Sequence, residues 1–137
     1  MKKTLCILHL EDDNLAWQLV CFHLERQGIH CESRRVETKG AFIEALEKGG
    51  FDLILSDISI PGFDGMSALS IASWMRPEVP YIFVSGHPDE GLAAEALMKG
   101  ASGYVLKSDV TKLALAVRRA TGGSGEPAGD VPGGQNT

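Results

Sequence analysis

The sequence predicts an α/β fold, a parallel sheet with helices on both of its faces. Five strand-like segments alternate with five helix-like segments along the 137 residues. That alternation is typical of strand–helix–strand units with parallel strands. Most of the strand-like segments are apolar along their whole length, which indicates strands buried on both faces. With 44% hydrophobic residues, the chain can build one domain with a core and is too short for two.

The strand-like segments differ in polarity, and this predicts their places in the sheet. The second segment, Cys-Glu-Ser-Arg-Arg-Val, is polar and is typical of an edge strand. The first, third and fourth segments are nearly all apolar and are expected at the centre. The strands are expected at Leu5–Leu10, Cys31–Val36, Leu53–Ser56, Tyr81–Val84 and Tyr104–Leu106.

Helical periodicity follows each strand-like segment. In the first helix, Leu15, Leu19 and Phe22 recur at helical spacing. In the last, Thr111 or the preceding Asp109 is a plausible N-terminal cap. Glycine or proline follows the predicted helices and ends them. The helices are expected at Asn14–Gln27, Gly40–Lys48, Gly65–Met75, Asp89–Lys99 and Thr111–Ala120.

The composition changes after residue 121. Residues 122–137 contain six glycines and two prolines, with Val131 as the one sizeable apolar side chain. Such a segment cannot bury enough surface to offset the entropy of ordering it. We therefore expect a folded domain over residues 1–121 and a disordered tail or linker over residues 122–137.

Charge and cysteine content narrow the classes of function. The formal net charge of −5 and a basic cluster no larger than Arg118-Arg119 argue against direct nucleic-acid binding. No apolar stretch reaches the roughly 20 residues of a membrane span, and no signal peptide is recognisable. Cys6, Cys21 and Cys31 are an odd number without metal-type spacing. They predict free, buried thiols in a reducing compartment, hence a cytoplasmic protein.

Three further residues are assigned to structure and not to chemistry. His9 lies inside the first strand-like segment and is expected to be a core or edge histidine. Trp17 and Trp74 fall in predicted helices, where they are expected to be packing residues.

Charged residues follow three of the predicted strands. Asp57 follows the third strand and precedes a turn with Pro61 and Gly62. The first strand runs into Glu11-Asp12-Asp13, and the fifth runs into Lys107. In open parallel α/β sheets, ligands bind at the edge formed by the carboxyl ends of the strands. The pattern therefore predicts a small site for a metal ion and a phosphate group.

The chemistry of these side chains supports that interpretation. Carboxylates such as Glu11, Asp12 and Asp57 are the ligands that Mg²⁺ prefers, and the ion would cancel the charge that repels a phosphate. A carboxylate can attack a phosphoryl group and form an aspartyl phosphate, while Lys107 stabilises the spread charge of the transition state. Ser85, after the fourth strand, could donate a hydrogen bond to a phosphoryl oxygen.

In order and spacing, these pieces resemble the receiver domain of bacterial two-component response regulators. The resemblance covers about residues 4–120 and rests on Glu11-Asp12, the Asp57–Gly65 segment, Ser85-Gly86 and Gly100–Lys107. It implies a flavodoxin-like fold, a doubly wound five-stranded parallel sheet with strand order 2-1-3-4-5 and five helices. It also implies that a histidine kinase or a histidine phosphotransfer protein transfers a phosphoryl group to the aspartate.

The resemblance further implies roles for individual residues. Mg²⁺ would be held by Glu11, Asp12, Asp57 and the main-chain carbonyl of Ser59. Ser85 and Tyr104 match the pair that repositions on phosphorylation and remodels the face of the fourth helix, fifth strand and fifth helix. That face is a candidate for a downstream partner, whose identity the sequence does not give, or for a homodimer. Asp13 is expected to help start the first helix.

One departure from the family pattern concerns the loop beside Lys107. Family members usually have proline after this lysine, commonly with a cis peptide bond, whereas Ser108 follows here. A cis bond before a residue other than proline costs about 2.5–4 kcal/mol. The geometry of this loop is therefore left open by the sequence.

The leading hypothesis is a phosphorylation-controlled signalling module that catalyses its own phosphorylation and dephosphorylation without being a metabolic enzyme. It could be a stand-alone regulator, a phosphate shuttle in a relay, or a receiver cut from a larger protein. The alternative is a Mg²⁺-dependent phosphatase with an aspartyl-phosphate intermediate, but its usual second acid is replaced by Ser59. A flavodoxin is a third possibility, although three acids after the first strand would repel the flavin phosphate.

Overall fold

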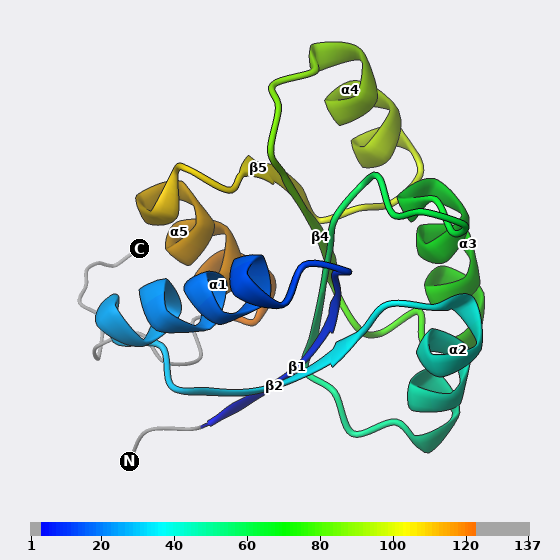
Figure 1. Cartoon of the computed structure of the whole chain (residues 1–137), viewed down its shortest axis with the longest axis horizontal. Helices are drawn as coiled ribbons and strands as arrows, with labels where there is room; N and C mark the ends of the chain where they lie inside the picture. Colours follow the sequence, from blue (N-terminus) through cyan, green and yellow to red (C-terminus); the bar gives the residue numbers. More distant parts are fainter. Residues whose placement is uncertain (1–3, 123–137) are drawn as a thin grey trace.

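The computed structural model describes residues 4–122 as a five-stranded parallel sheet with helices on both faces (Figure 1). The strand order is β2-β1-β3-β4-β5, which confirms the expected fold class. The strands are β1 (Leu5–Leu10), β2 (Cys31–Val36), β3 (Leu53–Ser56), β4 (Tyr81–Ser85) and β5 (Gly103–Leu106). The helices are α1 (Asn14–Arg26), α2 (Lys39–Lys48), α3 (Gly65–Met75), α4 (Glu90–Met98) and α5 (Val110–Ala120).

The polarity of each strand matches its place in the sheet. The polar strand β2 pairs only with β1 and forms one edge, as predicted. The apolar strands β1, β3 and β4 have neighbours on both sides, and every residue of β3 and β4 is buried. The parallel pairing brings the carboxyl ends of all the strands to the same edge of the sheet.

The core has two layers, one on each face of the sheet. Alternate residues of β1 separate them: Leu5 and Ile7 pack toward α1 and α5, whereas Leu8 and Leu10 pack toward α2 and α3. Figure 1 shows the same division, with α1 and α5 on one side of the strands and α2 and α3 on the other. Burial on both faces explains why the central strands are apolar without alternation.

Each helix is preceded by a capping residue whose side chain accepts hydrogen bonds from backbone N–H groups of the first turn. Such caps satisfy donors that have no partner within the helix. Asp13 caps α1, as predicted, and Asp109 caps α5, which decides between the two candidates for that helix. The capping residues are Asp13, Thr38, Asp64, Asp89 and Asp109.

The apolar periodicity in α1 does not mark the face that packs on the sheet. Leu15, Leu19 and Phe22 are 61%, 46% and 53% exposed, while Val20 and Leu24 are buried. The helix carries two apolar stripes, and spacing alone cannot tell which one meets the core. The expectation that Trp74 is a packing residue is also wrong, because its side chain is 82% exposed at the end of α3.

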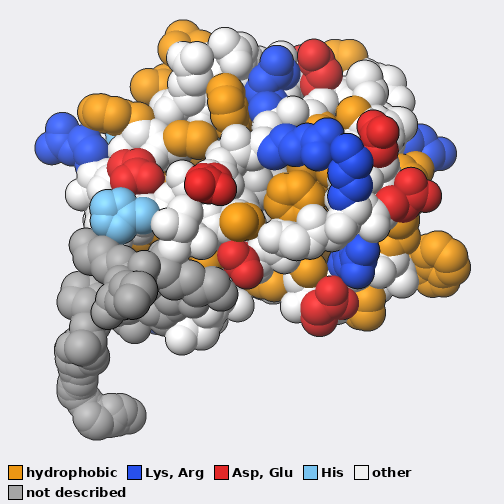
Figure 2. All heavy atoms as spheres, turned by 90° about the horizontal axis from the view of Figure 1, so that it is seen from below, with side chains coloured by type: hydrophobic (Ala, Val, Ile, Leu, Met, Phe, Trp, Pro, Cys, Tyr) orange, Lys and Arg blue, Asp and Glu red, His pale blue; other side chains and the backbone are white. Residues whose placement is uncertain are grey.

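The remaining expectations concern the thiols, His9 and the tail. The three cysteines are free, as predicted, but each is half-buried and not fully enclosed. His9 is fully buried, as expected of a core histidine. The predicted tail lies outside the described residues, apart from Gly122. No helix in residues 4–122 is long and apolar enough to cross a membrane. On the face shown in Figure 2, Lys and Arg side chains are interspersed with Asp and Glu.

Candidate functional site

Backbone pairing between strands places three charged residues at one edge of the sheet. Asp57 follows β3, and its N–H donates to the carbonyl of Leu10 at 2.9 Å, next to Glu11. Lys107 follows β5, and its N–H donates to the carbonyl of Ser85 at 2.7 Å. The ends of β1, β3 and β5 are thereby held together across β4. The carboxyl-edge site expected from the strand ends is present in the fold.

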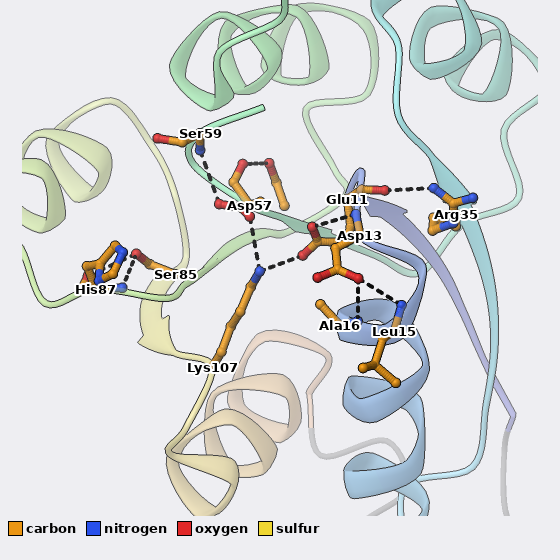
Figure 3. Close-up of polar contacts among 11 residues, drawn as sticks. Glu11, Asp13, Leu15, Ala16, Arg35, Asp57, Ser59, Ser85, His87 and Lys107 are labelled. Atoms are coloured by element: carbon orange, nitrogen blue, oxygen red, sulfur yellow. Dashed lines mark hydrogen bonds and ion pairs between the residues drawn. The ribbon is translucent and has the colours of Figure 1, made fainter. Parts of the chain in front are cut away.

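Lys107 joins the two acids from β1 and β3. Its Nζ lies 2.8 Å from Oε1 of Glu11 and 3.0 Å from Oδ2 of Asp57 (Figure 3). The Glu11 side chain is 1% exposed, that of Asp57 15% and that of Lys107 27%. Because these groups are largely buried, removing one partner would destabilise the fold more than breaking a surface ion pair would. The site therefore positions a cation between two carboxylates that would otherwise repel each other.

Three acids converge beside this lysine. One carboxylate oxygen from each of Glu11, Asp12 and Asp57 lies within 4.8 Å of the others. Glu11 is buried, Asp57 is half-buried and Asp12 is exposed. A set of oxygen ligands open to water on one side suits Mg²⁺, which binds one or two carboxylates and keeps several waters. The donor set therefore fits the ion that the sequence implied.

The charges of the site alter the acidity of its groups. Burial raises the pKa of Glu11 above its ordinary value, against the opposing effect of the contact with Lys107. Burial would lower the pKa of Lys107, but its contacts with Glu11 and Asp57 outweigh burial and raise that pKa. The lysine is therefore a firmly protonated cation, able to interact with an incoming anion.

Asp57 is held at both carboxylate oxygens. Its Oδ2 contacts Lys107, and its Oδ1 accepts a hydrogen bond from the backbone N–H of Ser59 at 3.1 Å. Both contacts are drawn in Figure 3. The side chain is thus oriented by two donors and still partly exposed. A carboxylate arranged in this way can be reached by a phosphoryl donor. The proposed role of the Ser59 carbonyl as a metal ligand stays a prediction.

Ser85 and Tyr104 converge on one backbone group. The Ser85 hydroxyl donates to the carbonyl of His87 at 2.9 Å and accepts from the His87 N–H at 3.2 Å. The Tyr104 hydroxyl also donates to the His87 carbonyl, at 3.4 Å. The tyrosine ring packs at 6.3 Å from the ring of Phe83. The two predicted switch residues therefore share an acceptor, which no sequence pattern indicated.

Arg35 and Gly65 shape the site in ways that the sequence analysis did not assign to them. Arg35, at the end of β2, donates from Nη1 to the carbonyl of Glu11 at 3.1 Å and so anchors the acidic loop. Gly65 begins α3 where there is no room for a side chain. A Cβ there would lie 2.7 Å from the ring of Phe83 and 2.8 Å from the carbonyl of Asp57. Arg35 sits near the carboxyl end of its strand, and that position was the available signal.

The loop after Lys107 forms a tight turn without a cis peptide bond. No cis peptide bond occurs in the described residues, so the bond between Lys107 and Ser108 is trans. The N–H of Asp109 donates to the carbonyl of Leu106 at 3.0 Å, and Asp109 then caps α5. A tight turn thus replaces the lysine–proline step that is usual in the family.

Comparison with known proteins agrees with this geometry. The family model for the response regulator receiver domain matches residues 7–118. The transcriptional regulator NtrC of Proteus hauseri is 32% identical over 111 residues, which are 80% of this chain and 23% of that protein. LuxO, a luminescence regulatory protein of Vibrio campbellii, is 34% identical over 99 residues, which are 69% of this chain and 21% of that protein. The chain therefore spans less than a quarter of these relatives.

Solved structures show the same fold. A response regulator receiver domain protein from Clostridium thermocellum has a TM-score of 0.73 at 26% identity, covering 86% of this chain and 94% of that one. A receiver domain protein from Methanospirillum hungatei also has a TM-score of 0.73 at 26% identity, covering 88% of this chain and 95% of that one. The chain belongs to the response regulator receiver domain family.

Proposed function

We propose that this receiver domain accepts a phosphoryl group on Asp57, with Mg²⁺, from a phosphohistidine of a kinase or phosphotransfer protein. The observation that carries the proposal is the contact of Lys107 with both Glu11 and Asp57, beside a cluster of three acids. A structural ion pair would need only one of these acids. The arrangement instead combines a partly exposed carboxylate, a buried carboxylate and a cation.

Each residue has a definite part in the transfer. One carboxylate oxygen of Asp57 is the nucleophile: it forms a bond to phosphorus as the bond between phosphorus and the donor's histidine nitrogen breaks. Lys107, already directed at Asp57, stabilises the negative charge spread over the phosphoryl oxygens. Glu11 and Asp12 are the further ligands for Mg²⁺, which when bound offsets the charge of the acids and of the phosphoryl group. Arg35 keeps the loop of Glu11 in place.

The switch is expected to work through the His87 carbonyl. In the present structure both Ser85 and Tyr104 donate to it. A phosphoryl group on Asp57 offers Ser85 a charged acceptor, and hydrogen bonds to charged groups are the stronger ones. Ser85 would then leave His87, and Tyr104 would be the remaining side-chain donor to that carbonyl. This change alters the loop between β4 and α4 and the adjoining face of α4, β5 and α5.

Two exposed apolar surfaces are proposed for the partners. The α1 stripe, defined as Leu15, Leu19 and Phe22, begins two residues after Asp13 and is therefore available to a donor protein approaching Asp57. On the other side, Leu97 of α4 and Leu115 of α5 are exposed around a hollow that Tyr104 also lines. We assign that hollow to the downstream effector or to a second copy of the chain.

We further propose that the domain catalyses its own phosphorylation and dephosphorylation and acts on no metabolic substrate. We also propose that residues 1–121 form the receiver domain and that it acts in the cytoplasm, where free thiols persist. The NtrC relatives carry the description of DNA-binding transcriptional regulators. A transcriptional output in the same pathway is an expectation from that likeness. A phosphatase is disfavoured, because Ser59 stands where its second acid is needed.

The test is intact-protein mass spectrometry after incubation with acetyl phosphate, with Mg²⁺ or with EDTA. Wild type is expected to gain one phosphoryl group only with Mg²⁺, and Asp57→Asn to gain none. Asp52→Asn is the matched control, because this half-buried aspartate at the other end of β3 contacts the backbone of Cys6 and not Lys107. Labelling of Asp57→Asn would refute the assignment. Turnover of a phosphate ester by wild type would favour the phosphatase.

A further inference from the structure

Helix α1 meets strand β2 along a line of polar and sulfur-containing side chains. Trp17, Cys21 and Glu25 are four residues apart and share one face of the helix. Ser33 and Cys31 are two residues apart and share one face of β2. Trp17 Nε1 donates to the Ser33 hydroxyl at 2.9 Å, and Oε2 of Glu25 accepts from the backbone N–H of Cys31 at 3.0 Å. Cys21 therefore lies between these two contacts, against Cys31.

The two thiols change each other's acidity. The neighbouring Cys31 thiol stabilises the thiolate of Cys21 and so lowers the pKa of Cys21 to about 7. The hydroxyl of Ser33 lowers it further, against the effects of burial and of the Glu25 carboxylate. Cys21 in turn raises the pKa of Cys31. Cys21 is thus the more acidic thiol of the pair and Cys31 the less acidic one. Thiolates are the reactive form of cysteine.

We propose that Cys21 and Cys31 form a redox-active dithiol, which a hydroperoxide converts reversibly into a disulfide between α1 and β2. The Cys21 thiolate attacks the terminal peroxide oxygen; the O–O bond breaks, and the leaving hydroxide or alkoxide takes a proton from solvent and departs as water or an alcohol. The resulting sulfenic acid is attacked by the sulfur of Cys31. The S–O bond breaks, and the hydroxide leaves as water with the Cys31 proton. The dithiol loses two electrons to the peroxide, and a thiol reductant restores it.

The dithiol is separate from the phosphorylation site. Cys31 is the first residue of β2, whereas Glu11, Asp57 and Lys107 follow the carboxyl ends of their strands. Parallel strands put their first residues and their carboxyl ends at opposite edges of the sheet. Oxidation is therefore expected to join the second half of α1 to the edge strand without touching the acidic site.

The third cysteine is a matched control. Cys6 is half-buried like the other two, but it alternates with Leu5 and Ile7, which pack toward α1 and α5. Its side chain therefore points to the opposite face of the sheet, where it lines a hollow with Glu32 and Arg34. From there it cannot reach α1.

The experiment treats the reduced chain with hydrogen peroxide, blocks the remaining thiols with an alkylating reagent and measures intact and peptide masses. Wild type and Cys6→Ser are expected to lose two hydrogens and to contain a peptide pair linked through Cys21 and Cys31. Cys21→Ser and Cys31→Ser are expected to lose that product, with Cys31→Ser stopping at the sulfenic acid. Oxidised wild type should melt at a higher temperature than the reduced chain and return to the lower value on reduction.

Several results would overturn the proposal. One is alkylation of all three cysteines in wild type after peroxide treatment that oxidises a simple thiol. Another is a disulfide that includes Cys6, or a link between two chains in place of one within a chain. A third is oxidation of wild type to the sulfinic acid without a disulfide. Circular dichroism of the reduced serine variants checks that they are folded, and the wild-type result stands without them.

Discussion

Replacing Lys107 with methionine should destabilise the protein and at the same time strengthen its binding of Mg²⁺. The substitution keeps most of the apolar stem but leaves Glu11, which is 1% exposed, next to Asp57 without a cation. Removing one partner of a buried ion pair costs about 3–5 kcal/mol. Because Lys107 is 27% exposed and Asp57 15%, we expect the lower end, about 3 kcal/mol at neutral pH. The site also becomes more negative by one charge, which favours a divalent cation.

Urea unfolding with and without Mg²⁺ measures both effects. An ion that binds only the folded state adds about 1.4 kcal/mol at ten times its dissociation constant, and the variant should reach this gain at less Mg²⁺ than wild type. Lys99→Met is the control, since the pair of Lys99 with Glu95 is exposed on α4. Such pairs contribute about 0.3–0.5 kcal/mol. If Lys107→Met lowers the free energy of unfolding no more than the control does, the energetic role assigned to this lysine is refuted.

The pH dependence gives a second check on the same variant. Burial already raises the pKa of Glu11 above 4.5, and loss of the opposing contact with Lys107 raises it further. A carboxyl group with a raised pKa binds its proton more tightly in the folded state than in the unfolded chain. Its protonation therefore stabilises the fold as the pH falls, and this stability is lost as the pH rises. The difference in unfolding free energy between wild type and the variant should therefore shrink from neutral pH toward 4.5. A difference that stays constant with pH would contradict this account.

Three other predictions test separate parts of the structure. Gly65→Ala should lower the free energy of unfolding by about 2 kcal/mol, because its Cβ would meet backbone and ring atoms at under 3.0 Å; unchanged urea unfolding would contradict it. Leu19→Asp, on the α1 stripe, should slow phosphorylation by a phosphohistidine donor protein but not phosphorylation by acetyl phosphate. Trp74→Asp, at another exposed side chain, is the control. Equal effects of the two variants would argue against docking of the donor on the α1 stripe. The alkylation rate of Cys21 should rise with pH and reach half its plateau at about 7, the pKa set by Cys31 and opposed by Glu25; a rate that is flat across this range would mean that Cys21 is not the thiolate.

The strands were predictable because a strand that is buried on both faces needs apolar residues along its whole length. The central strands β3 and β4 are buried at every position, so their segments are apolar throughout and bounded by polar turns. The edge strand β2 faces water and was recognisable by its charges. The helix ends were predictable to within one or two residues because Asp and Thr caps and glycines act locally.

The helix faces were less predictable. Leu15, Leu19 and Phe22 have the spacing of a core stripe, yet α1 rests on the sheet through Val20 and Leu24. Which stripe packs depends on how α1 lies against α5 and β2, and this is a property of the assembled domain. The exposure of Trp74 has the same origin: its side chain is 82% exposed beside a hollow that α2 and α3 line together.

For the candidate site, the linear order of residues was enough to identify the set Glu11, Asp12, Asp57 and Lys107 and the edge where they meet, because parallel strands all end on the same side. The order of residues could not predict which side chains of different elements contact each other. The anchoring of Glu11 by Arg35, the shared His87 carbonyl and the pairing of Cys21 with Cys31 each join segments that have no periodic or local relation. Composition and spacing record burial and chain direction, whereas side-chain partners are selected only when the elements pack in three dimensions.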